Sequence, residues 1–348
     1  MYATQPAREP VVITDTAGLS EEEWLEYRRT GIGGSDVSAV LGVSPFTTAR
    51  DLYYDKLRIT AAIDDEDNWV QKEVGHLLED LVARIFRVKT GYRVYQIKKM
   101  FRHPVHSFMI ADVDYFVEMP DGSAAILEIK TTNYNNRDKW WNGKDETVPV
   151  NYELQGRHYM AVMNVSRVYF CCLYGNSENE VVIRHKDRDL DYESEMIALE
   201  EHFWVNHVQA RIPPPYTEDG GLIMESVRRH HGAADPEAPE VLLNGDHAAN
   251  IARFLDLQDL KRELDNRVKA VDYQMNSLIV AEMGRSCLAS CEVEGTPYLV
   301  AYNPVLKTGI DKNGLFRLKE RHPEIYDEYV TVSESRRFYL RPKEREAA

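Results

Sequence analysis

The chain has 348 residues, of which 43% are apolar and 28% charged, and its formal net charge is −15 at pH 7. This composition suits one large or two modest globular domains with an ample core. The acidic balance argues against a protein that coats nucleic acid, which should be basic, but it allows an enzyme with a local basic track.

Neither a membrane span nor a secretion signal is expected. No run of about 18 apolar residues occurs, and residues 1–10 lack the apolar core of a signal peptide. The four cysteines are an adjacent pair and a distant Cys-x-x-x-Cys, a spacing that does not match an iron–sulfur cluster. Buried free thiols in a reducing, cytoplasmic compartment are therefore expected.

The chain opens with residues 1–20, which are polar and proline-containing and are expected to form a loose arm. A helix is predicted to begin after Ser20, which acts as N-cap, with Glu23 three residues later as the acid of a capping box. Leu19 and Trp24 form the corresponding hydrophobic staple.

A glycine-rich segment follows, Gly31-Ile32-Gly33-Gly34-Ser35-Asp36, and leads into an apolar helix. With Ser-Asp as N-cap, backbone N–H groups at the helix start would point at an incoming anion, and Arg28 is close in sequence. The segment is neither a P-loop nor a dinucleotide fingerprint, since no Gly-Lys-Ser/Thr follows and no strand precedes. Two interpretations stay open: tight packing in a helix–loop–helix, and a pocket for one phosphate.

Two helices are predicted next, over residues 49–57 and 69–89, separated by a solvated acidic loop at 61–68. Glu79 lies among the apolar positions of the longer helix. A glutamate in such a place lies either at the edge of the apolar stripe or in a functional site.

Strands are predicted at residues 92–100, 109–117 and 124–131, the last two joined as a β-hairpin by a turn that contains Asp-Gly. Alternation places Glu128 and Lys130 on the same face of an otherwise apolar strand, and Asp114 lies on the facing strand. Two such carboxylates suit a hard cation such as Mg²⁺. The other interpretation is a surface hairpin with an ordinary cross-strand ion pair.

The loop at residues 133–148 carries cations and two tryptophans, so it either contacts DNA or packs as a cover. A helix from Pro149 to about Asn164 would present Tyr152, Gln155 and Tyr159 on one face. The remaining elements expected before the domain edge at Pro213-Pro214-Pro215 are strands at 167–174 and 180–185 and a helix at 192–208.

Residues 216–245 are rich in glycine, proline and acids, as in a linker. A helix then shows heptad-like spacing, which fits an ordinary packed helix as well as a coiled-coil seam. Its apolar positions are Leu257, Leu260, Leu264, Val268, Val271, Met275 and Leu278. Two strands between residues 287 and 302, a short helix at 314–320 and a last strand at 336–339 complete the prediction.

Five ordered motifs resemble those of the YqaJ-type viral recombinase nucleases, relatives of the phage lambda exonuclease in the restriction-endonuclease-like (PD-(D/E)xK) superfamily. The motifs are Trp24-x3-Arg28-x2-Gly31-Ile32-Gly33-Gly34-Ser35-Asp36, Gly75-x3-Glu79, Ala111-x2-Asp114, Glu128-Ile129-Lys130 and Pro149-x2-Tyr152-x2-Gln155. The resemblance implies an α/β fold over residues 21–215, a restriction-endonuclease-like core with a mixed central sheet flanked by helices. Residues 246–348 are expected to form a helical and small β appendage, for which the sequence indicates no role.

The activity implied by the resemblance is a Mg²⁺-dependent exonuclease, with Mn²⁺ as a substitute, that digests double-stranded DNA 5′ to 3′ in phage-type recombination and leaves 3′ overhangs. The implied metal ligands are Asp114, Glu128, Glu79 and the backbone carbonyl of Ile129. Asp112 departs from the family pattern, and Asp114 is the preferred ligand. The implied catalytic helpers are Lys130, which positions or activates the water, and Gln155, which orients the site.

The implied substrate contacts are Arg28 and Ser35 on a terminal 5′ phosphate, together with Gly33, Gly34 and Tyr159. The implied partners are DNA ends, a single-strand annealing protein and further copies of the chain, with no membrane. Two alternatives remain: a site-specific or nicking endonuclease with the same core, and a catalytically idle DNA-binding or structural protein. A pocket for a terminal phosphate favours the exonuclease, because an endonuclease does not need one.

Overall fold

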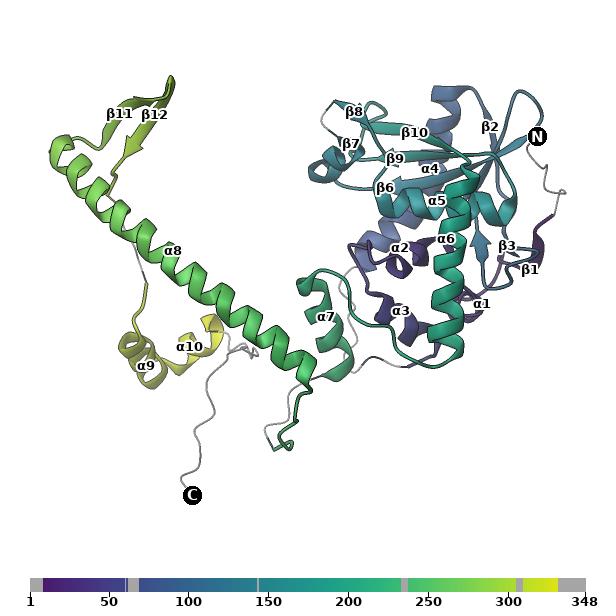
Figure 1. Ribbon diagram of the computed structural model, residues 1–348. Coiled ribbons are helices and arrows are strands. Elements are labelled where there is room, and N and C mark those ends of the chain that lie inside the picture. Colours follow the sequence, from purple (N-terminus) through teal and green to yellow (C-terminus); the bar gives the residue numbers. More distant parts are fainter. Residues whose placement is uncertain are drawn as a thin grey trace. The chain divides into compact units, whose positions relative to one another are not determined.

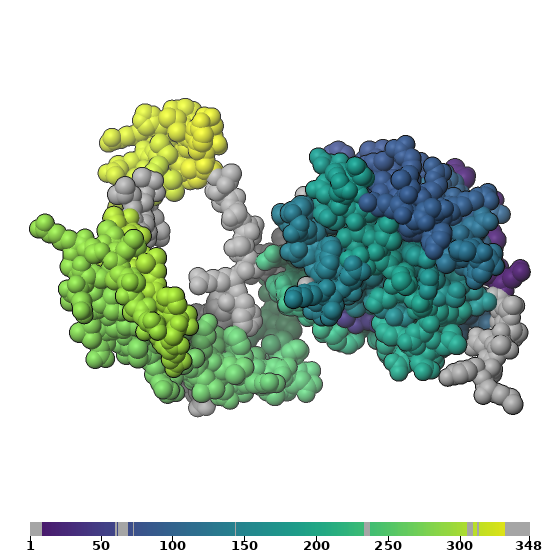
Figure 2. All heavy atoms as spheres, turned by 90° about the horizontal axis from the view of Figure 1, so that it is seen from above, coloured from purple at the N-terminus to yellow at the C-terminus, as the bar shows by residue number. Residues whose placement is uncertain are grey.

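The central strands are apolar on both faces, so the sheet that they form must be covered on both sides. The computed structural model describes residues 9–59, 61, 69–142, 144–232, 237–304 and 309–330. The chain divides into two compact units, residues 1–233 and 234–348. The atoms of the first unit, purple to teal in Figure 2, pack into one body.

The first unit is organised around a mixed five-stranded sheet with the strand order β10-β9-β6-β5-β2. Strands β6 and β9 are parallel and the other neighbours are antiparallel, which confirms the expected mixed α/β fold. The strands are β2 (Arg93–Tyr95), β5 (Tyr115–Glu118), β6 (Ala124–Thr131), β9 (Arg167–Leu173) and β10 (Val181–Asp187). The predicted hairpin is formed by β5 and β6, and its turn places Gly122 at φ 83°, a region that favours glycine.

Helices α4 (Trp69–Thr90) and α5 (Val150–Met163) cover the two faces of this sheet (Figure 1). On the α4 side, Phe86 packs edge-on against Tyr169 with ring centroids 5.4 Å apart. On the α5 side, Gly156 allows close approach, because a Cβ there would lie 2.5 Å from the Phe170 ring. Each face thus has its own apolar cluster.

A second, three-stranded sheet has the order β1-β3-β4. Its strands are β1 (Val11–Asp15), β3 (Lys99–Arg102) and β4 (Ile110–Asp112). Two sequence predictions are therefore wrong in detail: the expected strands at 92–100 and 109–117 are each divided between the two sheets. The expected loose arm also contains β1, which pairs with β3.

The remaining elements of the first unit are mostly helical. They are α1 (Glu21–Arg28), η1 (Gly34–Asp36), α2 (Val37–Val40), α3 (Ala49–Lys56), η2 (Tyr134–Trp140), β7 (Trp141–Asn142), β8 (Asp145–Glu146), α6 (Leu190–Phe203), η3 (Trp204–Gln209) and α7 (Gly220–His231). The capping box of Ser20 and Glu23 is confirmed in both of its hydrogen bonds. Helix α6 is followed by the π-helical turn η3, where a single helix was expected.

Helix α7 corrects the prediction that residues 216–245 form a linker. Its anchor is the buried carboxylate of Asp51 on α3, which accepts hydrogen bonds from Ser226 at 2.8 Å and His230 at 2.9 Å. A buried carboxylate requires such donors. Because Asp51 lies 175 residues before Ser226, local composition gave no sign of this contact.

The second unit contains the long helix α8 (Gly245–Met283), the hairpin of β11 (Leu288–Val293) and β12 (Thr296–Ala301), and helices α9 (Lys312–Arg321) and α10 (Pro323–Tyr329). The expected hairpin is confirmed, whereas the strand at 336–339 and most of the acidic loop at 61–68 lie outside the described residues. Cys287 and Cys291 are exposed, so only Cys171 and Cys172 are the buried free thiols that were expected. Within the described ranges, no helix combines the length and apolarity needed to cross a membrane.

A buried charge pair links three elements of the first unit. His158 of α5 contacts Glu200 of α6 through Nδ1 at 3.0 Å and the carbonyl of Ile110 in β4 through Nε2 at 2.9 Å. A carbonyl only accepts hydrogen bonds, so Nε2 carries a proton. Burial lowers the pKa of His158, but the Glu200 carboxylate outweighs it and holds that pKa above its ordinary value.

We expect His158→Gln to destabilise the first unit in a pH-dependent way. Because the folded-state pKa is raised, the stabilisation is fully present below about pH 6.5 and is lost as pH rises through the folded value. Breaking a buried pair costs about 3 kcal/mol, or about 6–12 °C in melting temperature for a domain of this size.

The measurement is thermal unfolding at pH 5.5 and pH 8.5, with the exposed His202→Gln on α6 as matched control. The control should melt like the unaltered protein. An equal loss of melting temperature for His158→Gln at both pH values would contradict an ionised pair.

Candidate metal site and the adjoining arginine corner

Asp114 lies where the chain passes from β4 to β5, at the end of the β5–β6 ladder. The last paired residues are Tyr115 and Leu127, and the next inward N–H, that of Ile129, donates to Asp114 Oδ2 at 2.9 Å. The side chain thus continues the ladder where the strand itself ends. A single strand was expected at 109–117, but β4 ends before Asp114 and β5 begins after it. This break in the strand directs the Asp114 carboxylate toward β6.

Glu128 and Lys130 share the α5 face of β6, as alternation predicted. Lys130 Nζ donates to Glu128 Oε1 at 2.6 Å and to Gln155 Oε1 at 3.0 Å, and Gln155 Nε2 donates to the same Glu128 oxygen at 2.5 Å. The three side chains form a closed hydrogen-bonded ring, in which the orientation of the Gln155 amide is determined by its partners. The ring of Tyr152 lies beneath Lys130 Nζ, 4.9 Å from its centroid.

Both carboxylates are destabilised as anions. Burial and then the Glu128 charge raise the pKa of Asp114 to about 7. Burial also raises the pKa of Glu128, although Lys130 opposes it. Burial alone would lower the pKa of Lys130, but the two carboxylates raise it, so the lysine is an ammonium at neutral pH.

The residues fit a divalent cation. Glu128 Oε2 is buried and has no hydrogen-bond partner among the described residues, which leaves an acceptor for a ligand. Glu79 of α4 contacts His76 Nδ1 through Oε1 at 3.3 Å, and burial and then the Asp114 charge raise its pKa. In the described part of the chain no three His, Cys, Asp or Glu side chains gather into a ready chelate. An ion here would therefore complete its shell with backbone oxygen and water, as Mg²⁺ commonly does.

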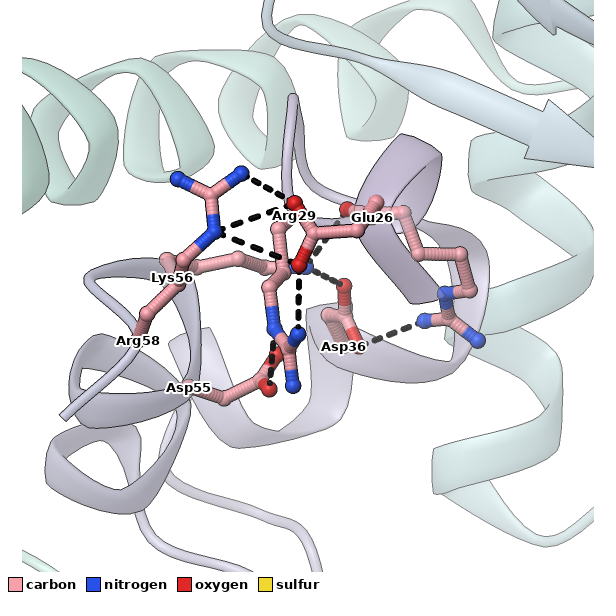
Figure 3. Close-up of polar contacts among 7 residues, drawn as sticks. Glu26, Arg29, Asp36, Asp55, Lys56 and Arg58 are labelled. Carbon is pink, nitrogen blue, oxygen red and sulfur yellow. Dashed lines mark hydrogen bonds and ion pairs between the residues drawn. The ribbon is translucent and has the colours of Figure 1, made fainter. Parts of the chain in front are cut away.

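Arg28 and Ser35 come together as the sequence suggested, with Arg28 Nη2 2.9 Å from Ser35 Oγ. The same nitrogen also donates to Asp36 Oδ1 at 2.7 Å, and Asp36 Oδ2 accepts from Lys56 Nζ at 2.7 Å. Figure 3 shows Asp36 and Lys56 beside a separate network of Glu26, Arg29, Asp55 and Arg58. We call the group of Arg28, Ser35, Asp36 and Lys56 the arginine corner.

The expected Ser-Asp N-cap is confirmed in position only: Asp36 is the N-cap residue of α2, but its side chain makes no capping hydrogen bond to that helix. Gly33 is the N-cap of η1, and its N–H is taken by the Asp36 carboxylate at 2.9 Å. Burial opposes ionisation of Asp36, but Arg28 and Lys56 hold its pKa well below the ordinary value. Two cations against one carboxylate leave the corner with one positive charge, and the Lys56 side chain is only 1% exposed against 22% for Arg28. Arg28 is thus the cation available to an anion.

Close packing at two glycines joins the arginine corner to the carboxylate site, by which we mean Asp114 and Glu128. A Cβ on Gly34 would lie 2.5 Å from the Tyr159 ring and 3.0 Å from Gln155 Cγ. Gln155 Nε2 is in turn 3.4 Å from Tyr159 Oη and bonded to Glu128. At Gly33 a Cβ would lie 2.9 Å from the Arg28 guanidinium. The two glycines therefore serve close packing of the two groups.

Asp112, the alternative ligand, is engaged elsewhere. Its Oδ2 accepts a hydrogen bond from Trp24 Nε1 at 2.7 Å, and the Trp24 ring lies 5.1 Å from the Arg28 guanidinium. Asp112 thus positions the indole beneath the arginine. Sequence reasoning missed this role and that of Lys56; the four-residue spacing of Trp24 and Arg28 on one helix was the available signal.

Within the described residues, the loop at 133–148 packs against α5 and β10. Trp140 is buried and stacks on Tyr152 with centroids 5.9 Å apart, so it packs as a cover. Trp141 lies 5.2 Å from the Arg184 guanidinium, itself held by Glu146. The loop thereby supports the side of α5 that carries Gln155.

Residues 23–166 match the model of the YqaJ-like viral recombinase domain. The protein YqaJ of Bacillus subtilis (strain 168), described as uncharacterized, is 28% identical over 339 residues, covering 95% of this chain and 97% of that protein. Residues 23–166 are thus similar to the YqaJ-like viral recombinase domain, and nearly the whole chain is similar to YqaJ. The resemblance inferred from the five motifs is thereby confirmed.

Solved structures with some similarity include an alkaline exonuclease, LHK-Exo, from Laribacter hongkongensis. It is 19% identical, with a TM-score of 0.44 over 60% of this chain and 98% of that chain. A phage related exonuclease from Haemophilus somnus 129PT is 12% identical, with a TM-score of 0.39 over 54% of this chain and 99% of that chain.

We expect Asp114→Asn to raise the melting temperature in metal-free buffer at pH 8. The carboxyl has a folded-state pKa of about 7, against about 3.9 unfolded. Asp114 therefore lowers the free energy of unfolding progressively as pH rises from about 4 to 7, and this destabilisation is complete above pH 7. The gain should be several degrees at pH 8 and much smaller at pH 5.

Adding Mg²⁺ should raise the melting temperature of the unaltered protein but hardly that of Asp114→Asn, since only the former offers both carboxylates. Asp112→Asn is the matched control and should keep the Mg²⁺ response. If Asp112→Asn loses that response and Asp114→Asn keeps it, the ligand assignment is wrong.

Proposed function

We propose that this chain is a Mg²⁺-dependent exonuclease that digests one strand of double-stranded DNA from the 5′ end and leaves 3′ overhangs. The observation that carries the proposal is the contact between the arginine corner and the carboxylate site through Gly34, Tyr159 and Gln155. An anion-binding group immediately beside a hydrolytic site is what removal of terminal nucleotides requires.

Asp114 and Glu128 would hold the ion, with Glu79 and the Ile129 carbonyl as further oxygen donors. When bound, the ion supplies charge neutralisation for the paired carboxylates and stabilisation of charge on the phosphate oxygens. The unpartnered Glu128 Oε2 and the raised pKa values of Asp114 and Glu128 support this assignment.

Lys130 acts in this proposal as a fixed cation. Its raised pKa makes it a poor proton acceptor at neutral pH, so it suits holding a water or a phosphate oxygen by hydrogen bonding. Gln155 accepts from the ammonium and donates to Glu128, and thereby holds both groups in one orientation. Burial of this ring excludes bulk water, which strengthens its electrostatic interactions.

Arg28 and Ser35 would receive the terminal 5′ phosphate. The phosphate would replace part of the contact between Arg28 and Asp36. The net positive charge of the arginine corner favours binding of this anion. Trp24, held by Asp112, keeps the guanidinium in place from below. A single-strand annealing protein as partner and a homo-oligomeric state belong to the same proposal.

We expect Lys130→Ala to keep DNA binding while cleavage falls by about a hundredfold or more, the usual cost of removing one preorganised charge stabiliser. Cleavage is measured on linear duplex with and without Mg²⁺, and binding by fluorescence anisotropy in Ca²⁺. The exposed Lys139→Ala, in the nearby loop, is the control and should cleave normally. Full cleavage by Lys130→Ala would remove the lysine from the reaction.

We expect a 5′-phosphorylated duplex to be digested faster than its 5′-hydroxyl twin, and Arg28→Ala to erase most of that difference. A charge-assisted hydrogen bond contributes about 1.5–3 kcal/mol, which corresponds to about tenfold to a hundredfold in rate. Arg28→Lys keeps the charge without the planar fork and should give an intermediate value. Initial rates on the two duplexes are the measurement.

Arg29→Ala is the matched control, since Arg29 pairs instead with Glu26 and Asp55 (Figure 3). It should preserve the preference for 5′ phosphate. Equal rates on both ends with the unaltered protein, or cleavage of closed circular DNA, would favour an endonuclease with the same core.

A further inference from the structure

Helix α8 has a long apolar stripe that no other part of the second unit covers among the described residues. The helix runs for 39 residues, about 58 Å at 1.5 Å per residue, and none of its side chains is buried. Leu264, Val271 and Leu278 are 58%, 64% and 68% exposed. Helices in proteins owe most of their stability to packing of an apolar face, so this stripe lacks the partner that a helix of this length usually has.

The stripe follows a heptad repeat, with Leu260 beside it at a g position. Position d is occupied by Leu257, Leu264, Val271 and Leu278, and position a by Lys261, Val268 and Met275. Leucine at d with β-branched valine at a favours two strands, and a single lysine at a specifies register and oligomeric state. A seven-residue period is maintained by supercoiling with another helix, whereas an ordinary surface helix follows the 3.6-residue period.

Charges beside the stripe indicate which helix is the partner. Arg267 occupies a g position, and Asp265 and Asp272 occupy e positions. In a parallel pair, g of one helix faces e of the following heptad in the other, so Arg267 would face Asp272 of a second copy, twice by symmetry. An antiparallel pair of full overlap would place Asp265 against Asp272, an arrangement of like charges.

Asp272 can take part in such a pair. One of its carboxylate oxygens, Oδ1, accepts a hydrogen bond from Asn276 at 2.7 Å, one turn along the same helix. This bond fixes the aspartate at the side of the stripe. A carboxylate accepts several hydrogen bonds, so a guanidinium from another chain can be added.

We propose that α8 forms a parallel, in-register, two-stranded coiled coil with α8 of a second copy of this chain. The seam consists of the a and d positions between Leu257 and Leu278, and the Arg267–Asp272 pairs set its orientation. This inference does not depend on the proposed nuclease activity, and it places the second unit as the part that joins two copies.

The test is disulfide cross-linking of the full chain. The exposed Cys287 and Cys291 are first replaced by serine, while the buried Cys171 and Cys172 remain. In this background Leu264→Cys places a thiol at d, and Asn266→Cys places one at the outer f position of the same turn. Under mild oxidation most of the Leu264→Cys protein should become a disulfide-linked dimer, at a rate at least tenfold above Asn266→Cys.

Orientation is tested with single cysteines near the two ends of the seam. Leu257→Cys and Leu278→Cys should each link to themselves, since equal positions meet only in a parallel pair. Arg267→Asp should slow cross-linking through Leu264→Cys about tenfold, because two attractive pairs become repulsive. The exchanged variant Arg267→Asp with Asp272→Arg should restore it.

Equal cross-linking at Leu264→Cys and Asn266→Cys would overturn the proposal, even if the protein associates through other surfaces. Failure of Leu257→Cys and Leu278→Cys to self-link would overturn the parallel arrangement. Failure of the exchanged variant to recover would remove the Arg267–Asp272 pair from the interface.

Discussion

The first unit depends on one constraint: Glu128 and Lys130 carry charge onto the covered face of a central strand. A charge in such a place is tolerated only when it is paired and hydrogen-bonded. Gln155 closes the ring between the two and thereby ties α5 to β6. Asp114 adds a second carboxylate that burial and repulsion keep close to protonation. A divalent cation bound there would relieve the repulsion between the two carboxylates.

The arginine corner shows the opposite balance. Asp36 receives two cations, so the group retains a positive charge, and Arg28 is the more exposed of the two. Gly34 brings this corner against Tyr159 and Gln155, because any side chain at that position would collide with them. An acidic chain with a net charge of −15 thus presents a cation beside a carboxylate pair, the local arrangement that a phosphodiester substrate needs.

The two units illustrate two ways of satisfying an apolar surface. In the first, both sheet faces are covered by helices, and α7 is held to α3 by Asp51. In the second, α8 has no buried side chain, and its heptad repeat with flanking charges is complementary to itself.

The sequence by itself determined the features that depend on local periodicity. Alternation placed Glu128 and Lys130 on one face, the capping box located α1, and the Asp-Gly turn produced the β5–β6 hairpin. Tertiary structure decided what depends on distant partners. Asp114 lies at a strand break, where its carboxylate accepts a hydrogen bond from the N–H of Ile129. Helix α7 belongs to the first unit because its Ser226 donates to the carboxylate of Asp51 on α3. Asp36 likewise turned an apparent N-cap into an ion-pair centre, because Lys56 approaches from another helix. Such contacts join residues that no local pattern relates, and they decide which polar groups are available to a ligand.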